Sequence, residues 1–151
     1  MHPNQSSLDL GLADSILSQR VRPDLDQFAA AAFEEAAREF VAAKARAGEW
    51  SFLPERIGSW WSRSAELDVL AINQAGKLAL VGECKWSINP LGTNILEDLK
   101  RRAEAMAQES GIEHFQYALF ARKGFTEALK EQARREEIGL FTVEDLIQSK
   151  E

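Results

Sequence analysis

The sequence predicts an α/β fold in which a mixed central sheet is flanked by helices, and three observations support this. Residues 26–44 are rich in alanine, contain no glycine or proline, and repeat their apolar residues at helical spacing. Residues 66–86 hold two apolar runs separated by a short polar stretch, which is typical of a β-hairpin. After the hairpin, helical and strand patterns alternate. The expected order is therefore helix, strand, hairpin, helix, strand, helix, strand.

Length and composition fit one domain. The 151 residues are 45% hydrophobic and 28% charged, and the formal net charge of −6 excludes a generally basic nucleic-acid-binding surface. We expect residues 1–23 to be a polar tail with a short helix, and residues 24–151 to be a single domain. The single cysteine excludes an internal disulfide and fits a reducing, cytoplasmic setting. No run of about 18 apolar residues is present, so no membrane span is expected.

The helix expected over residues 26–44 should bury one side. On a helical wheel its apolar residues share one arc, and most of its glutamates face away from that arc. Glu34 is the exception, because it lies within about 20° of Val41 at the border of the arc. A border glutamate is usually a surface residue. Glu34 therefore gains a functional interpretation only if this helix packs beside the hairpin. Gly48 is expected to end the helix.

The aromatic stretch that follows is expected to hold the first strand, over residues 57–62. Alternation along a strand would put Trp60 and Trp61 on opposite faces. Packing in the core and at the sheet edge is the favoured interpretation of both rings, and stacking on nucleic-acid bases is the alternative.

The hairpin carries acids and a lysine within its apolar strands. If residues 74–77 form a four-residue loop, counting back places Asp68 opposite Glu83, with Cβ atoms roughly 5 Å apart. Carboxylates that close repel each other and raise each other's pKa unless a cation lies between them. The pattern therefore predicts a divalent-metal site at Asp68 and Glu83. Lys85, two residues along the strand, would hold a water or an oxyanion beside it.

The later elements are expected at residues 93–110 (helix), 115–120 (strand), 125–137 (helix), 138–143 (strand) and 144–149 (helical turn). Thr93 or Asn94 is expected to cap the first of these helices. Its polar side carries Lys100, Arg101 and Arg102, the most basic cluster in the chain. A solvated helix face is the default interpretation of this cluster, and contacts with nucleic-acid phosphates near the hairpin are the functional one.

This order of elements, with an acid on the second strand and Glu-x-Lys on the third, resembles the PD-(D/E)XK nuclease superfamily. The resemblance implies a restriction-endonuclease-like core in which Asp68, Glu83 and Lys85 form the catalytic site, completed by Glu34 from the first helix. It also implies that the three acids and the backbone carbonyl of Cys84 bind Mg²⁺ or Mn²⁺. The proline of the superfamily's name is absent, since a Glu-Leu pair precedes Asp68.

A closer resemblance covers about four fifths of the chain, from residue 24 to residue 143. It is to a domain family of unknown function found at the C-terminus of some archaeal and bacterial AAA-type ATPases. The shared segments are Phe33-Glu34, Ile57-Gly58-Ser59-Trp60-Trp61, Glu66-Leu67-Asp68 and Gly82-Glu83-Cys84-Lys85-Trp86. This resemblance implies a AAA-type ATPase as a partner, although the chain itself has no ATPase motif.

We therefore expect a Mg²⁺-dependent nuclease domain that hydrolyses phosphodiester bonds of a nucleic acid, with DNA as the expected substrate. The resemblance also allows a homodimer, because many nucleases of this fold pair to cut both strands. One alternative is a catalytically silent module of the same fold that binds nucleic acid or an ATPase partner, which the net charge of −6 favours. The other is an antiparallel-sheet protein without a site, in which Asp68 and Glu83 point apart.

Overall fold

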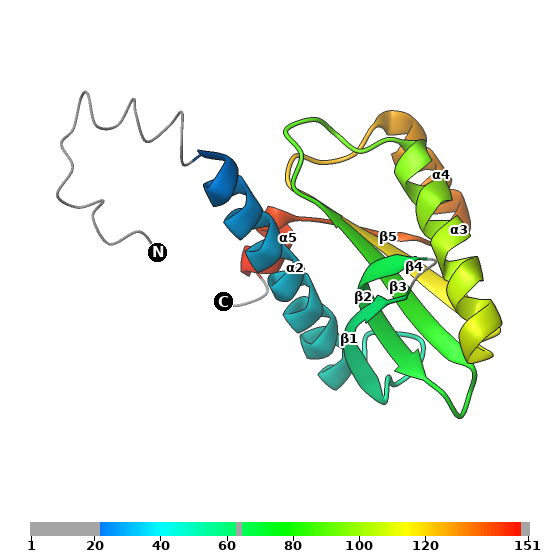
Figure 1. Cartoon of the computed structure of the whole chain (residues 1–151). Coiled ribbons are helices and arrows are strands. Elements are labelled where there is room, and N and C mark those ends of the chain that lie inside the picture. The colour runs from blue at the N-terminus through cyan, green and yellow to red at the C-terminus, as the bar shows by residue number, and fades with distance from the viewer. Residues whose placement is uncertain (1–21, 63–64, 149–151) are drawn as a thin grey trace, which may run out of the picture.

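The computed structural model describes residues 22–62 and 65–148 (Figure 1). The tail and short helix expected at the N-terminus lie outside the described residues, apart from residues 22 and 23. The elements follow the predicted order. They are α2 (Arg22–Arg46), β1 (Arg56–Trp61), β2 (Glu66–Asn73), β3 (Leu78–Lys85), α3 (Thr93–Ser110), β4 (His114–Ala121), α4 (Glu127–Glu136), β5 (Gly139–Thr142) and α5 (Val143–Gln148).

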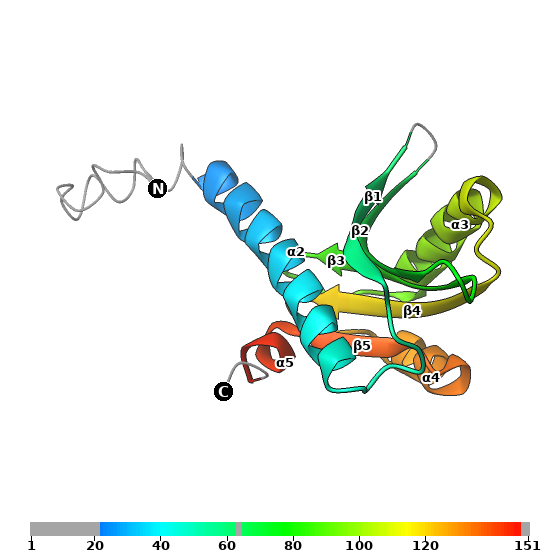
Figure 2. The same cartoon turned by 90° about the horizontal axis from the view of Figure 1, so that it is seen from below.

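The five strands form one mixed sheet in the order β1-β2-β3-β4-β5. Strands β1, β2 and β3 are antiparallel neighbours, and β4 and β5 run parallel to β3. Figures 1 and 2 show α2 on one face of this sheet and α3 with α4 on the other. The prediction of a mixed sheet flanked by helices is therefore confirmed. Within residues 22–62 and 65–148, no helix combines the length and apolar character needed to cross a bilayer.

The sheet separates two hydrophobic layers. The layer under α2 and α5 includes Phe33, Phe40, Val41, Val69, Leu80, Phe120 and Leu146. The layer under α3 and α4 includes Leu67, Val81, Leu96, Leu99, Met106, Leu119 and Leu129. Because strands β2, β3 and β4 carry apolar side chains on both faces, they read as nearly continuous apolar runs in the sequence.

Helix α2 packs on the sheet as its wheel predicts. Its buried residues are Phe33, Ala37, Phe40, Val41 and Ala45, and its exposed residues include Glu35 and Glu39. The helix begins at Arg22 rather than at residue 26, because Pro23 falls in the first turn, where its missing N–H breaks no helical bond. Gly48 ends the helix with a φ of +74°, and its N–H donates to the carbonyl of Ala45 at 3.0 Å.

The hairpin has the predicted register. Asn73 pairs with Leu78 and Val69 pairs with Gly82, so residues 74–77 form the four-residue loop. Asp68 lies one residue beyond the last of these pairs. Beyond the pair of Val69 and Gly82, β2 no longer pairs with β3. We call this point, at Asp68 on β2 and Glu83 on β3, the fork. Figure 2 shows β1 and β2 bending together away from the rest of the sheet beyond it.

The start of α3 differs from the prediction. Neither Thr93 nor Asn94 caps the helix, since the N-cap residue is Gly92, which has an extended backbone and makes no side-chain capping bond. The position of this helix start is set by tertiary contacts instead. Leu91 donates its N–H to the carbonyl of Gly124 at 2.9 Å, which ties the loop before α3 to the loop after β4.

Candidate active site at the fork of β2 and β3

Asp68 and Glu83, which we call the acid pair, meet at the fork. The N–H of Cys84 donates to Asp68 Oδ2 at 2.9 Å, and the negative charge of Glu83 acts on the same carboxyl. Glu83 is 4% exposed and is the one buried charged side chain in the described part of the chain. The structure thus brings together the two carboxyls that the hairpin register predicts. The alternative of an antiparallel-sheet protein without a site, in which Asp68 and Glu83 point apart, disagrees with this arrangement.

The electrostatics of the acid pair favour a proton or a cation between the two carboxyls. Burial foremost, together with the adjacent charge of Glu83, raises the pKa of Asp68 to about 7. The N–H of Cys84 opposes the rise, because it donates to the charged carboxylate. Asp68 is therefore poised between its protonated and charged forms near neutral pH.

Helix α2 brings two further side chains to the fork. Arg38 donates from Nη1 to the backbone carbonyl of Asp68 at 2.8 Å. Glu34, one turn earlier on the helix, has a raised pKa, foremost because of burial. Arg38 opposes that rise in pKa, and the charge of Glu83 adds to it. Helix α2 thus packs beside the hairpin, which is the condition under which Glu34 gains a functional interpretation.

Both carboxylate oxygens of Glu83 have cationic partners. Arg102 Nη1 lies 3.1 Å from Oε1, and Lys85 Nζ lies 3.3 Å from Oε2. Arg102 also donates to the backbone carbonyl of Glu66 at 2.7 Å and pairs with Asp98 at 2.8 Å. Its Nε is buried without a hydrogen-bond partner among the described residues. The Arg102 guanidinium therefore connects α3 to the ends of both β2 and β3.

The basic cluster of α3 does not form one surface. Arg102 turns toward the acid pair, Lys100 binds Glu136 of α4 at 2.6 Å, and Arg101 pairs with Asp98. The Arg101 side chain is 74% exposed. Contact of these three residues with nucleic-acid phosphates stays a prediction, and each would have to leave an acidic partner to make it.

Cys84 serves the site through its backbone. Its side chain is buried in the layer under α2. Burial foremost, together with the charge of Asp68, raises the pKa of the thiol, so the sulfur stays protonated and unreactive. The backbone N–H holds Asp68, whereas binding of a metal by the Cys84 carbonyl stays a prediction.

Two contacts at the acid pair, those of Arg38 and Arg102, were absent from the sequence prediction. Arg38 is four residues from Glu34, so it lies on the same border of the α2 wheel. Arg102 lies three and four residues from Leu99 and Met106, both fully buried. From these spacings, both arginines could have been predicted at the border of a buried helix face and not on a solvated face.

The donor set at the fork fits Mg²⁺ or Mn²⁺, which prefer hard oxygen ligands. Within the described ranges, no group of three or more Asp, Glu, His or Cys side chains is placed to hold a metal ion. Two carboxylates are nevertheless enough for Mg²⁺, which is commonly held by one or two of them and completes its shell with water and substrate phosphate. Burial is the largest cause of the raised pKa of Asp68 and the charge of Glu83 is the next, and a bound cation would relieve the repulsion between the two carboxylates.

Comparison with known proteins gives a family and one curated relative. A family model described as "Archaea bacterial proteins of unknown function" (DUF234) matches residues 1–106. An uncharacterized protein of Methanocaldococcus jannaschii is 33% identical to this chain over 84 residues. That alignment covers 56% of this chain and 18% of the relative, so the chain spans less than a fifth of the relative's length.

Two solved structures resemble parts of the fold. A repair endonuclease from Pyrococcus abyssi matches with a TM-score of 0.48 and 22% identity, over 72% of this chain and 45% of that one. The protein of unknown function AF1548 matches with a TM-score of 0.49 and 19% identity, over 78% of this chain and 66% of that one.

Proposed function

The chain belongs to the DUF234 family of archaeal and bacterial proteins, and we propose that it is a metal-dependent nuclease-like domain that hydrolyses phosphodiester bonds of a nucleic acid. The observation that carries this proposal is the acid pair. A buried Glu83 and a partly buried Asp68 meet at the fork, and the ammonium group of Lys85 lies 3.3 Å from Glu83. Asp, Glu and Lys in this arrangement match the pattern of the PD-(D/E)XK nucleases.

Each residue of the pattern has a role in this proposal. A bound Mg²⁺ or Mn²⁺ would polarise the scissile phosphate and lower the pKa of a water. Asp68, Glu83 and the carbonyl of Cys84 would hold the ion, because all three offer oxygen ligands. The Lys85 side chain is 45% exposed, so its ammonium can reach a substrate phosphate and stabilise the negative charge that develops on it.

Helix α2 would support these groups from one side. Glu34 would complete the ligand set or hold the orientation of Lys85. Arg38 would position Asp68 by fixing its backbone carbonyl, to which it donates at 2.8 Å.

Mn²⁺ calorimetry and a cleavage panel on single- and double-stranded DNA and RNA test this function. Asp68→Asn should abolish both Mn²⁺ binding and cleavage. Lys85→Ala should keep Mn²⁺ binding and lower the cleavage rate on the order of 100-fold, because it removes one stabiliser of the transition-state charge. Glu113→Gln is the matched control, since Glu113 pairs with Lys77 and is 59% exposed. Cleavage that persists in Asp68→Asn would remove the assignment.

A second candidate is a catalytically silent module of the same fold that binds nucleic acid or an ATPase partner. The paired state of Glu83 favours it, because Arg102 and Lys85 already contact its two carboxylate oxygens. Such a module would give no Mn²⁺ binding heat in the wild-type protein, and Asp68→Asn would leave its partner binding unchanged. A AAA-type ATPase partner and a homodimer remain proposals taken from the family resemblance. Co-elution with the ATPase and light scattering test them.

A further inference from the structure

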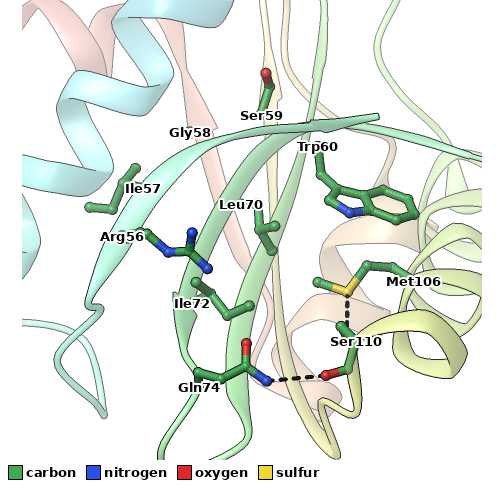
Figure 3. Close-up of a pocket in the computed structure, with 10 residues that line it drawn as sticks. All are labelled: Arg56, Ile57, Gly58, Ser59, Trp60, Leu70, Ile72, Gln74, Met106 and Ser110. Atoms are coloured by element: carbon green, nitrogen blue, oxygen red, sulfur yellow. Dashed lines mark hydrogen bonds between the residues drawn. The ribbon is translucent and has the colours of Figure 1, made fainter. Parts of the chain in front are cut away.

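A groove of about 360 Å³ lies between the β1–β2 ribbon and helix α3 (Figure 3). Trp60 and Arg56 of β1 line it on the sheet side, and Met106 and Ser110 of α3 line it on the helix side. Figure 3 shows the indole of Trp60 and the guanidinium of Arg56 at separate places along this hollow. We call it the β1–α3 groove.

The β1–α3 groove leads away from the acid pair. Arg102, Met106 and Ser110 are spaced four residues apart on α3, so they lie along one side of the helix. The first of them contacts Glu83 of the acid pair, and the other two line the groove. On the sheet side, Trp60 pairs with Leu67, the residue that directly precedes Asp68. A nucleic-acid strand that is bound at the fork and runs along α3 would therefore enter this groove.

The walls of the groove combine an aromatic ring, a cation and hydrogen-bonding groups. Trp60 is partly buried, whereas Arg56 is exposed. Gln74 donates from Nε2 to the carbonyl of Ser110 at 3.1 Å, so an amide group also borders the hollow. Aromatic faces with nearby cations are the chemistry that binds the bases and phosphates of single strands.

The size and position of the groove select against a duplex. Its volume is near the lower end of the range for small-molecule sites, about 300–1,000 Å³, which suits a nucleotide-sized group. In a duplex each base is covered on both faces by its neighbours, so no base could reach a ring that lies between a strand and a helix.

We propose that the β1–α3 groove binds unpaired nucleobases, with a base on Trp60 and a phosphate on Arg56, and that the substrate is single-stranded nucleic acid. The proposal rests on the proposed function, since it takes the acid pair as the place where that strand is cut. It makes Trp60 and Arg56 substrate-binding residues outside the Asp, Glu and Lys pattern.

Fluorescence anisotropy in EDTA, with labelled single-stranded DNA, single-stranded RNA and a duplex of the same sequence, tests the groove without cleavage. The wild-type protein should bind at least one single strand about tenfold or more tightly than the duplex. Trp60→Leu, which keeps an apolar side chain against the core, should raise the Kd for that strand about 5- to 150-fold. Trp61→Leu is the matched control, because Trp61 is 77% exposed and does not line the groove.

A second variant keeps the test valid even if Trp60→Leu does not fold, because Trp60 packs against the core. Arg56→Gln alters an exposed side chain, and it should weaken binding and reduce the salt dependence by about one phosphate contact. Wild-type affinity for the single strand in Arg56→Gln and in a folded Trp60→Leu would overturn the proposal, as would equal affinity of the wild-type protein for strand and duplex.

Mn²⁺ calorimetry separates failure of the groove from failure of the nuclease proposal. Trp60→Leu and Arg56→Gln should bind Mn²⁺ as the wild-type protein does, whereas Asp68→Asn should lose Mn²⁺ and keep its affinity for the single strand. If the wild-type protein binds the strand through the groove but binds no Mn²⁺, the nuclease proposal fails and the groove stands. If Mn²⁺ binding is intact but the groove variants bind the strand normally, only the groove proposal fails.

Discussion

Two cationic side chains contact the carboxylate of the buried Glu83. A buried carboxylate without a partner costs several kcal/mol, and removal of one partner of a buried pair is strongly destabilising. Arg102 and Lys85 each contact one oxygen of Glu83, but the Lys85 side chain is 45% exposed and shares its charge with water. Most of the stabilisation of Glu83 should therefore come from Arg102.

Arg102→Met should lower the free energy of unfolding on the order of 3 kcal/mol in EDTA, because it leaves Glu83 with Lys85 alone. Urea denaturation measures this change. Arg101→Met is the control and should change stability by less than about 0.5 kcal/mol, since the Arg101 side chain is 74% exposed. Added Mn²⁺ should restore part of the loss in Arg102→Met by supplying another cation at the acid pair. Equal stability of the two variants would contradict this role of Arg102.

Asp68 should make the stability of the metal-free protein depend on pH. Its pKa is raised by burial and by Glu83 from an ordinary value of 3.8 to about 7, so the folded protein holds a proton that the unfolded chain releases. This bound proton contributes fully to the free energy of unfolding below about pH 4, and its contribution is lost as the pH rises through 7. Relative to Asp68→Asn, the wild-type protein should lose on the order of 2 kcal/mol between pH 4 and pH 8, after allowance for screening by water.

Urea midpoints of the two proteins across this pH range measure the difference. Glu113→Gln, which alters an exposed carboxylate at the other end of β3, should follow the wild-type curve. Parallel curves for the wild-type protein and Asp68→Asn would show that Asp68 titrates normally.

Among the elements, the hairpin was predictable because its own residues determine its pairing. A four-residue loop at 74–77 sets the register, and counting back from it places Asp68 beside Glu83. The arginine contacts were not predictable in this way. Arg38 reaches Asp68 from α2, and Arg102 reaches Glu83 from α3, so both depend on how helices distant in sequence pack on the sheet.

Strand β3 passes close to its neighbours at Gly82, on the face covered by α2. A Cβ atom there would lie 3.1 Å from Val69 Cβ and 3.2 Å from Phe120 Cε1. Gly82→Ala should therefore destabilise the protein by about 1–3 kcal/mol through overpacking. Gly58→Ala is the control, because a Cβ at Gly58 meets nothing within 4 Å, and it should be neutral or slightly stabilising. Thermal unfolding of both variants measures the difference, and a neutral Gly82→Ala would show that β3 can shift.

At the scale of the whole molecule, the candidate site lies at the ends of β2 and β3, where side chains from helices on both faces of the sheet contact the same strand ends. Helix α2 covers one face of the sheet and α3 the other, yet an arginine from each binds at the fork. The order of the elements predicted the sheet and its flanking helices. It did not predict the fork as their meeting point, because the bend of β1 and β2 away from β3 is a property of the assembled sheet.

The acid pair, Lys85, Glu34 and both arginines all come from residues 34–102, and the family match ends at residue 106. The remainder of the described chain, β4 to α5, supplies Phe120, Leu129 and Leu146 to the two layers and no side chain to the acid pair. The side chains of the candidate site thus lie in the first part of the described chain, but the backbone that presents them does not stand alone. Strand β4 pairs with β3 at Glu83, Cys84 and Lys85, so any C-terminal portion grafted after α3 would have to supply a parallel strand at the same register to keep the acid pair in place.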